Sequence, residues 1–138
     1  MKHINRWAIV LLVLAGLLLS ACGPASETVE KEPPSKLEPI DGTDLSRVIL
    51  TQKAAERLDI QTFPVNGMEV PYAAIIYDIE GKTWVYTNPQ PLTFVRAPIV
   101  IDRIEGDMVI LAEGLDPDTT VVTVGVAELY CTETGVSK

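Results

Sequence analysis

Between residues 70 and 130, apolar runs of strand length alternate with turns centred on Gly or Pro. The turns include Glu80-Gly81-Lys82, Glu105-Gly106-Asp107 and Asp116-Pro117-Asp118. Short apolar runs at this spacing are typical of antiparallel strands joined by tight connections. No run is long enough for a crossover helix, which a parallel sheet needs. The pattern predicts an all-β, mainly antiparallel fold: a small β-barrel or β-roll with one short helix.

A shorter segment upstream completes this unit. Residues 47–50 read as a strand, and Thr51 is suited to cap a helix over residues 51–58. Residues 60–65 alternate as a second strand, and Asn66-Gly67 predicts a tight turn. We therefore expect one β-domain over residues 46–131 and a frayed tail over residues 132–138. Within the domain, we expect residues 72–79 to form a single strand buried on both faces. In the next strand, over residues 83–87, we expect Trp84 and Tyr86 on one face and Val85 on the other.

The N-terminus has the composition of a secretory leader. Lys2 and Arg6 are followed by an apolar run over residues 7–19. That run is short for a membrane-spanning helix and ends in small residues, so residues 1–21 are predicted to be a signal peptide. Residues 22–45 are rich in Pro, Glu, Ser and Lys, which predicts a flexible linker.

The end of the leader, Leu19-Ser20-Ala21-Cys22, resembles the lipobox of bacterial lipoproteins. In that family the chain is cut before the cysteine, whose sulfur is acylated. The resemblance implies that Cys22 is the lipidated first residue of the mature chain. Several acyl chains on one residue would give stable anchoring. We expect a lipid-anchored, extracytoplasmic protein of the cell envelope, on the periplasmic side where two membranes are present.

The predicted mature chain lacks the residues of common catalytic sites. His3, the only histidine, lies in the leader, so histidine nucleophile systems and histidine metal sites are excluded. The acidic side chains sit at turns, where they serve local hydrogen bonding. An acid–base pair could be drawn from five of them, Asp102, Glu105, Asp107, Asp116 and Asp118, but we favour the role in turns. We therefore predict no enzyme activity, no cofactor and no metal.

Charge excludes a further class of partner. Without Lys2 and Arg6 the mature chain keeps nine basic and all 19 acidic residues, a net charge of −10. Such a surface repels nucleic acid and disfavours adsorption to anionic lipid. Membrane contact is therefore expected through the lipid anchor.

Two features allow two interpretations each. The aromatic residues Tyr72, Tyr77, Trp84 and Tyr86 fit either a small β-core or an exposed binding face, and a core is favoured. Once Cys22 is acylated, Cys131 has no disulfide partner in the chain. It then serves as a small buried hydrophobe near a strand end, which we favour, or as an intermolecular or redox-active thiol.

The order of segments over residues 47–131 resembles the membrane-proximal domain of periplasmic adaptor proteins, also called membrane fusion proteins. These adaptors link efflux pumps of the resistance-nodulation-division type to an outer-membrane channel. The similarity rests on residues 50–62, on the strand pair at residues 70–86, and on three C-terminal segments: Arg103-Ile104-Glu105-Gly106-Asp107, Gly114-Leu115-Asp116-Pro117-Asp118 and Val121-Val122-Thr123-Val124-Gly125.

The chain also departs from that family. Only a few residues separate Val65 from the meander, so the lipoyl-like domain and the α-helical hairpin of full adaptors are absent. Cys131 stands where the family usually has Gly. The resemblance therefore implies a non-catalytic docking or accessory module beside an efflux transporter or a full-length adaptor. The alternative is a stand-alone lipoprotein that binds a small ligand or ion.

Overall fold

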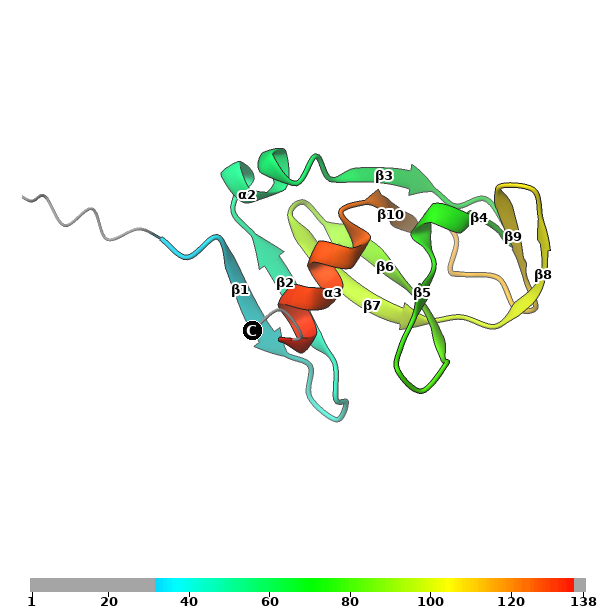
Figure 1. The fold of residues 1–138 in the computed structure, drawn as a ribbon, viewed down its shortest axis with the longest axis horizontal. Coiled ribbons are helices and arrows are strands. Elements are labelled where there is room, and N and C mark those ends of the chain that lie inside the picture. Colours follow the sequence, from blue (N-terminus) through cyan, green and yellow to red (C-terminus); the bar gives the residue numbers. More distant parts are fainter. Residues whose placement is uncertain (1–31, 136–138) are drawn as a thin grey trace, which may run out of the picture. The chain divides into compact units, whose positions relative to one another are not determined.

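The computed structural model describes residues 32–135, which form two antiparallel sheets (Figure 1). The larger sheet has the order β1-β2-β7-β6-β10-β3, with β5 paired to β6, and the smaller has the order β4-β9-β8. The large-sheet strands are β1 Ser35–Pro39, β2 Ser46–Leu50, β3 Gln61–Pro64, β5 Ile76–Tyr77, β6 Thr83–Gln90, β7 Thr93–Pro98 and β10 Thr120–Val124. The small-sheet strands are β4 Glu69–Pro71, β8 Ile101–Glu105 and β9 Met108–Leu111. The mainly antiparallel β-fold predicted from the turn spacing is confirmed.

The helices follow from local sequence signals. In α2, Gln52–Arg57, the Thr51 hydroxyl accepts a hydrogen bond from the Ala54 amide at 3.2 Å, which is the predicted cap. A 3-10 turn, η2, spans Tyr72–Ala74. The last helix, α3, spans Val126–Thr134 and is preceded by Gly125, whose φ of 86° favours glycine.

The centre of the fold is β6, which is buried on both faces. Val85 and Tyr86 are adjacent in the strand, so they point to opposite sides. Both are fully buried, each in a different hydrophobic cluster. The sequence prediction that Trp84 and Tyr86 share one face of this strand is confirmed, since both pack in the first cluster.

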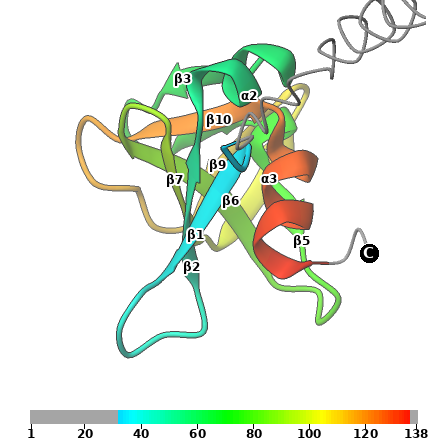
Figure 2. The ribbon, with the colours of Figure 1, turned by 90° about the vertical axis from the view of Figure 1, so that its left-hand side faces the viewer.

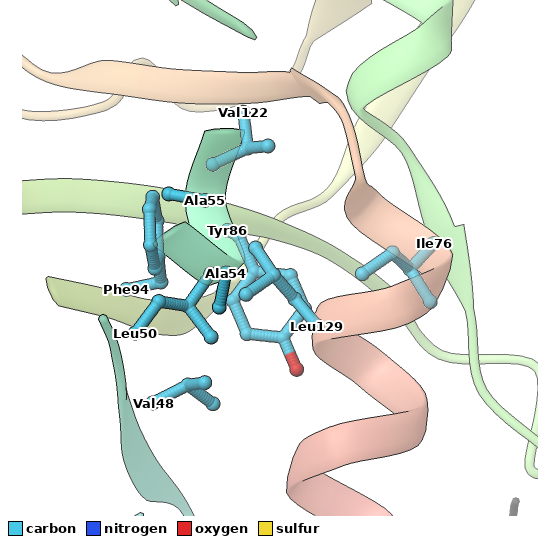
Figure 3. Packing of buried hydrophobic residues seen from close by; sticks show 9 residues of the cluster. All are labelled: Val48, Leu50, Ala54, Ala55, Ile76, Tyr86, Phe94, Val122 and Leu129. Carbon is cyan, nitrogen blue, oxygen red and sulfur yellow. The ribbon is translucent and has the colours of Figure 1, made fainter. Parts of the chain in front are cut away.

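The first cluster lies where α2 and α3 cover the large sheet (Figures 2 and 3). Leu129 of α3 and Ala54 and Ala55 of α2 pack there against side chains of the sheet, with the Tyr86 ring among them. The second cluster joins the two sheets through Val85 and Val121 on one side and Val109 and Leu111 on the other. The two clusters together hold the helices and both sheets in one unit.

The predicted closure into a barrel is wrong. The large sheet is open, ending in β1 on one side and β3 on the other, and these two strands do not pair. Closure needs a continuous ladder with a consistent stagger between strands. Here the outer strand β1 carries an exposed ion pair between Lys36 and Glu38, and charges of this kind protect a free edge from further pairing.

Three boundaries differ from those predicted. Strand β1 lies within residues 22–45, for which a flexible linker is predicted; it pairs with β2 over five residue pairs, which satisfies its backbone. Helix α3 extends through Thr134, so the frayed tail predicted from residue 132 is wrong for residues 132–134. Residues 72–79 form the 3-10 turn and the two-residue β5 rather than one strand, and Tyr72 and Tyr77 are exposed.

Candidate functional site

An apolar groove lies where the hairpin formed by β5 and β6 meets the segment that leads from β7 into β8. Its volume is about 580 Å³. Large apolar side chains dominate its lining, with Gly81, Lys82 and Thr83 at the hairpin: they are Tyr77, Trp84, Pro98, Ile99, Val100, Ile101 and Ile104. The groove therefore draws on both sheets and on the connection between them.

The hairpin wall is held by Asp78. Its Oδ1 accepts hydrogen bonds from the Glu80 and Lys82 amides, both at 2.9 Å, and its Oδ2 accepts one from the Trp84 indole N–H at 2.9 Å. The indole and then the backbone donors lower the pKa of Asp78, because they stabilise its charged form. One carboxylate thus shapes the turn and fixes the indole that forms part of the groove.

The opposite wall follows from a proline. Pro98 ends β7 opposite Trp84, and it has no amide hydrogen to continue the ladder. The next residue, Ile99, is buried and donates its amide to the Thr83 carbonyl at 3.0 Å. The chain then enters β8 of the small sheet, leaving Val100 60% exposed and Ile104 50% exposed.

Further exposed apolar residues extend this surface along the hairpin. Tyr77 is 50% exposed and Ile79, at the turn, is 97% exposed. Partial desolvation, followed by the influence of the neighbouring Tyr72, raises the pKa of Tyr77. Burial as a core, the interpretation favoured for the four aromatic residues, is thus right for Tyr86 but wrong for Tyr72 and Tyr77.

A buried polar network behind the groove is absent from the sequence predictions. Glu133 of α3 has a side chain only 3% exposed, and it accepts a hydrogen bond from the Tyr86 hydroxyl. Arg96 Nη2 donates to Glu133 Oε1 at 3.2 Å, and Arg96 Nε lies 3.2 Å from Oε2, within ion-pair range but without hydrogen-bond alignment. The Ser46 amide donates to Oε1 at 3.3 Å. The carboxylate therefore joins α3 to β2, β6 and β7.

This network also reaches the groove. The Arg96 guanidinium carbon lies 4.6 Å from the Trp84 ring centroid and 5.4 Å from that of Tyr130, both within cation–π range. Trp84 is therefore held by Arg96 and by Asp78. Desolvation first, and then Glu133, raises the pKa of Tyr86, so its hydroxyl stays protonated as a donor.

The turn carboxylates are placed apart from any such network. Asp102 and Glu105 flank Arg103 on β8, accepting from it at 2.7 Å and 2.5 Å. Asp107 lies in the turn between β8 and β9, while Asp116 and Asp118 lie in the loop before β10. Within residues 32–135 no three His, Cys, Asp or Glu side chains gather as they would around a metal ion.

Of the two cysteines, the structure describes only Cys131. The predicted lipidation site, Cys22, lies outside the described residues. Cys131 is half-buried on α3 rather than near a strand end, and within the described residues it forms no disulfide. Among these residues, none of the helices has the length and apolar character needed to cross a membrane.

Comparison with protein-family models, with curated proteins and with solved structures finds no match for this chain.

Proposed function

We propose that this protein is a lipid-anchored, extracytoplasmic docking module of the cell envelope, without catalytic activity, that binds a transporter or a full-length adaptor protein. The lipobox-like segment ending at Cys22 supports the anchor. The resemblance of residues 47–131 to the membrane-proximal domain of efflux-pump adaptors supports the class of partner. The sheet order and the groove supply the surface on which docking would occur.

The exposed apolar groove is the observation that carries the proposal. Three large apolar residues that line it are well exposed: Tyr77, Val100 and Ile104. An exposed apolar surface of this kind costs free energy in water, and in soluble domains it is typical of an interaction site. The pocket floor is fixed by the Asp78 and Arg96 contacts to Trp84, so the surface is formed before a partner arrives.

Co-purification tests the docking function. The tagged full chain is extracted from membranes of its own host in mild detergent, and its partners are identified by mass spectrometry. We expect an envelope transporter or adaptor protein in a fixed ratio to the tagged chain. Recovery of the tagged chain alone would contradict the proposal.

The anchor has its own control. Cys22→Ala removes the only sulfur at the lipobox-like segment, so we expect loss of label from radioactive palmitate and loss of retention in the membrane fraction. Unchanged labelling of the variant would show that the anchor is elsewhere.

A second function, binding of a small ligand, is favoured by the size of the groove. Its volume of about 580 Å³ falls in the range of small-molecule sites, roughly 300–1,000 Å³. A ligand that binds only the folded state raises the melting temperature. A thermal-shift screen of apolar metabolites would reveal this function if one compound stabilises the protein and Val100→Asp abolishes the effect.

A further inference from the structure

One sequence motif takes no part in the groove or in the buried polar network. Asn66-Gly67 lies in the connection between β3 of the large sheet and β4 of the small sheet. The nearest buried residues on either side, Val65 and Val70, are 3% and 0% exposed, and both belong to the second hydrophobic cluster. The motif is therefore a short exposed span between two buried valines, and a change in its covalent structure would act on the joint between the sheets.

The turn leaves two groups of Asn66-Gly67 free to react with each other. Both residues are exposed, and Gly67 has a φ of 81°, which favours glycine. Within residues 32–135, neither the Asn66 side-chain amide nor the Gly67 backbone amide forms a hydrogen bond with another residue. A Cβ added at Gly67 would have no atom within 4 Å, so no neighbouring residue shields the turn on that side.

The other asparagine of the described residues, Asn88, is held in a different way. Its Nδ2 donates to the Gln90 carbonyl at 2.7 Å and to the Thr93 carbonyl at 2.9 Å. The next residue is Pro89, whose nitrogen carries no hydrogen. A ring closure that needs a backbone N–H is therefore blocked at Asn88, which makes this residue an internal control for Asn66.

We propose that Asn66 is a site of spontaneous deamidation through a cyclic imide formed with the Gly67 amide. The Gly67 nitrogen gives up its proton and bonds to Asn66 Cγ, and the side-chain nitrogen takes up a proton and leaves as ammonia. Water then opens the five-membered ring at one of its two carbonyl carbons, which yields aspartate or isoaspartate. One water is consumed and one ammonia is released, so no oxidant or further reactant is needed. The inference does not depend on the docking function.

The isoaspartyl product changes the joint between the sheets. Both products add a negative charge, but only isoaspartate adds a carbon atom to the main chain. Backbone hydrogen bonds hold the span on both sides, from the Val65 amide to the Thr119 carbonyl and from the Leu111 amide to the Met68 carbonyl, both at 2.8 Å. A longer span should strain these bonds and loosen the second cluster, which includes Ile99 of the groove.

Timed incubation of the purified full chain in detergent micelles tests the reaction. Samples taken at neutral and mildly alkaline pH are digested in acid, where the imide does not form, and the peptides are mapped by mass spectrometry. We expect the peptide that contains Asn66 to gain one dalton, faster at the higher pH because the Gly67 amide must lose a proton. An isoaspartyl methyltransferase should label the same peptide. The peptide that contains Asn88 should keep its mass.

Variants separate the chemistry from its structural effect. Asn66→Gln requires a six-membered ring, which closes far more slowly, so this variant should keep its mass and its stability. Asn66→Asp supplies the charge without the additional main-chain atom. The isoaspartyl form, separated from aged protein by chromatography, should unfold at a lower urea concentration than either variant.

Other results would overturn the inference. Absence of a mass gain at Asn66 in the folded chain would refute the reaction, and conversion in urea alone would show that the fold protects the turn. An equal mass gain at Asn88 would exclude the imide route. An isoaspartyl form as stable as Asn66→Asp would refute the effect on the joint. Each of these results holds whether or not a transporter co-purifies with the chain, so the docking function stands or fails separately.

Discussion

Replacing Glu133 with leucine should be among the most damaging single changes in the domain. The substitution removes the carboxylate that receives Arg96, the Tyr86 hydroxyl and the Ser46 amide. The Arg96 side chain is only 11% exposed, so little water can replace the lost carboxylate. Breaking a buried ion pair by removing one partner costs about 3–5 kcal/mol.

The lower part of that range applies here. Arg96 keeps its contacts with the rings of Trp84 and Tyr130, which compensate a part of its charge. The buried Tyr86 hydroxyl loses its acceptor, which by itself costs about 1–3 kcal/mol. These costs overlap because one rearrangement can relieve both groups, so we expect a loss of about 3 kcal/mol in the free energy of unfolding.

Urea denaturation followed by Trp84 fluorescence measures this loss. Of the two tryptophans, Trp7 lies in the predicted signal peptide, so Trp84 is the single emitter of the mature chain. A triple variant, Arg96→Met with Glu133→Leu and Tyr86→Phe, removes the whole polar network and should recover stability to within about 1–2 kcal/mol of the parent. A Glu133→Leu variant within about 1 kcal/mol of the parent, or a triple variant as unstable as the single one, would refute the reasoning.

Three further predictions concern local structure. Gly125→Ala should destabilise the domain by about 1–3 kcal/mol in urea melts, because φ is 86° and the added Cβ would lie 2.2 Å from Ile60 Cδ1. Ile60→Val removes that Cδ1 atom and should restore part of the lost stability. The control Gly42→Ala measures the backbone strain alone, because φ there is 79° and no atom lies within 4 Å of the added Cβ. Asp78→Asn should weaken the loss of stability that the parent shows as pH is lowered. The pKa of Asp78 is lowered in the folded state, so its contribution to stability is present above about pH 4 and is lost as pH falls below that value. The free energy of unfolding, measured for both proteins from pH 6 to pH 2.5, checks this. Thr51→Ala removes the acceptor for the Ala54 amide and should cost about 1 kcal/mol, whereas Thr51→Ser should cost little, as measured by thermal unfolding.

Local sequence signals predict most of the strands and turns of the fold. Thr51 predicted the start of α2, and the glycines at residues 81 and 106 predicted turns that the structure forms with positive φ. Alternation in β6 correctly separated Val85 from Trp84 and Tyr86, because a strand has a period of two whatever surrounds it. These features depend on residues that are close together in sequence, so they can be predicted from the sequence alone.

Features set by distant contacts were missed. The apolar run at residues 72–79 predicted a buried strand, yet η2 interrupts it and Tyr77 reaches solvent. The sequence places Glu133 in a frayed tail, because nothing near it in sequence shows that Arg96 and Tyr86 lie opposite. The groove likewise joins residues from a hairpin and from a second sheet, so composition alone could not locate it. Arg96 is the only charged residue in the otherwise apolar β7, and a lone arginine in such a strand indicates a buried acidic partner.

Site-specific photo-crosslinking tests most directly whether the groove is the docking surface of an envelope protein. Benzoylphenylalanine is placed at Val100, on the groove, and in a matched strain at Lys53, an exposed position on α2. After irradiation of intact cells, the crosslinked products are purified and their partner peptides sequenced by mass spectrometry. The account predicts a crosslink from Val100, and not from Lys53, to an apolar segment of a transporter or adaptor protein. The same products from both positions, or a crosslink from Lys53 alone, would contradict it.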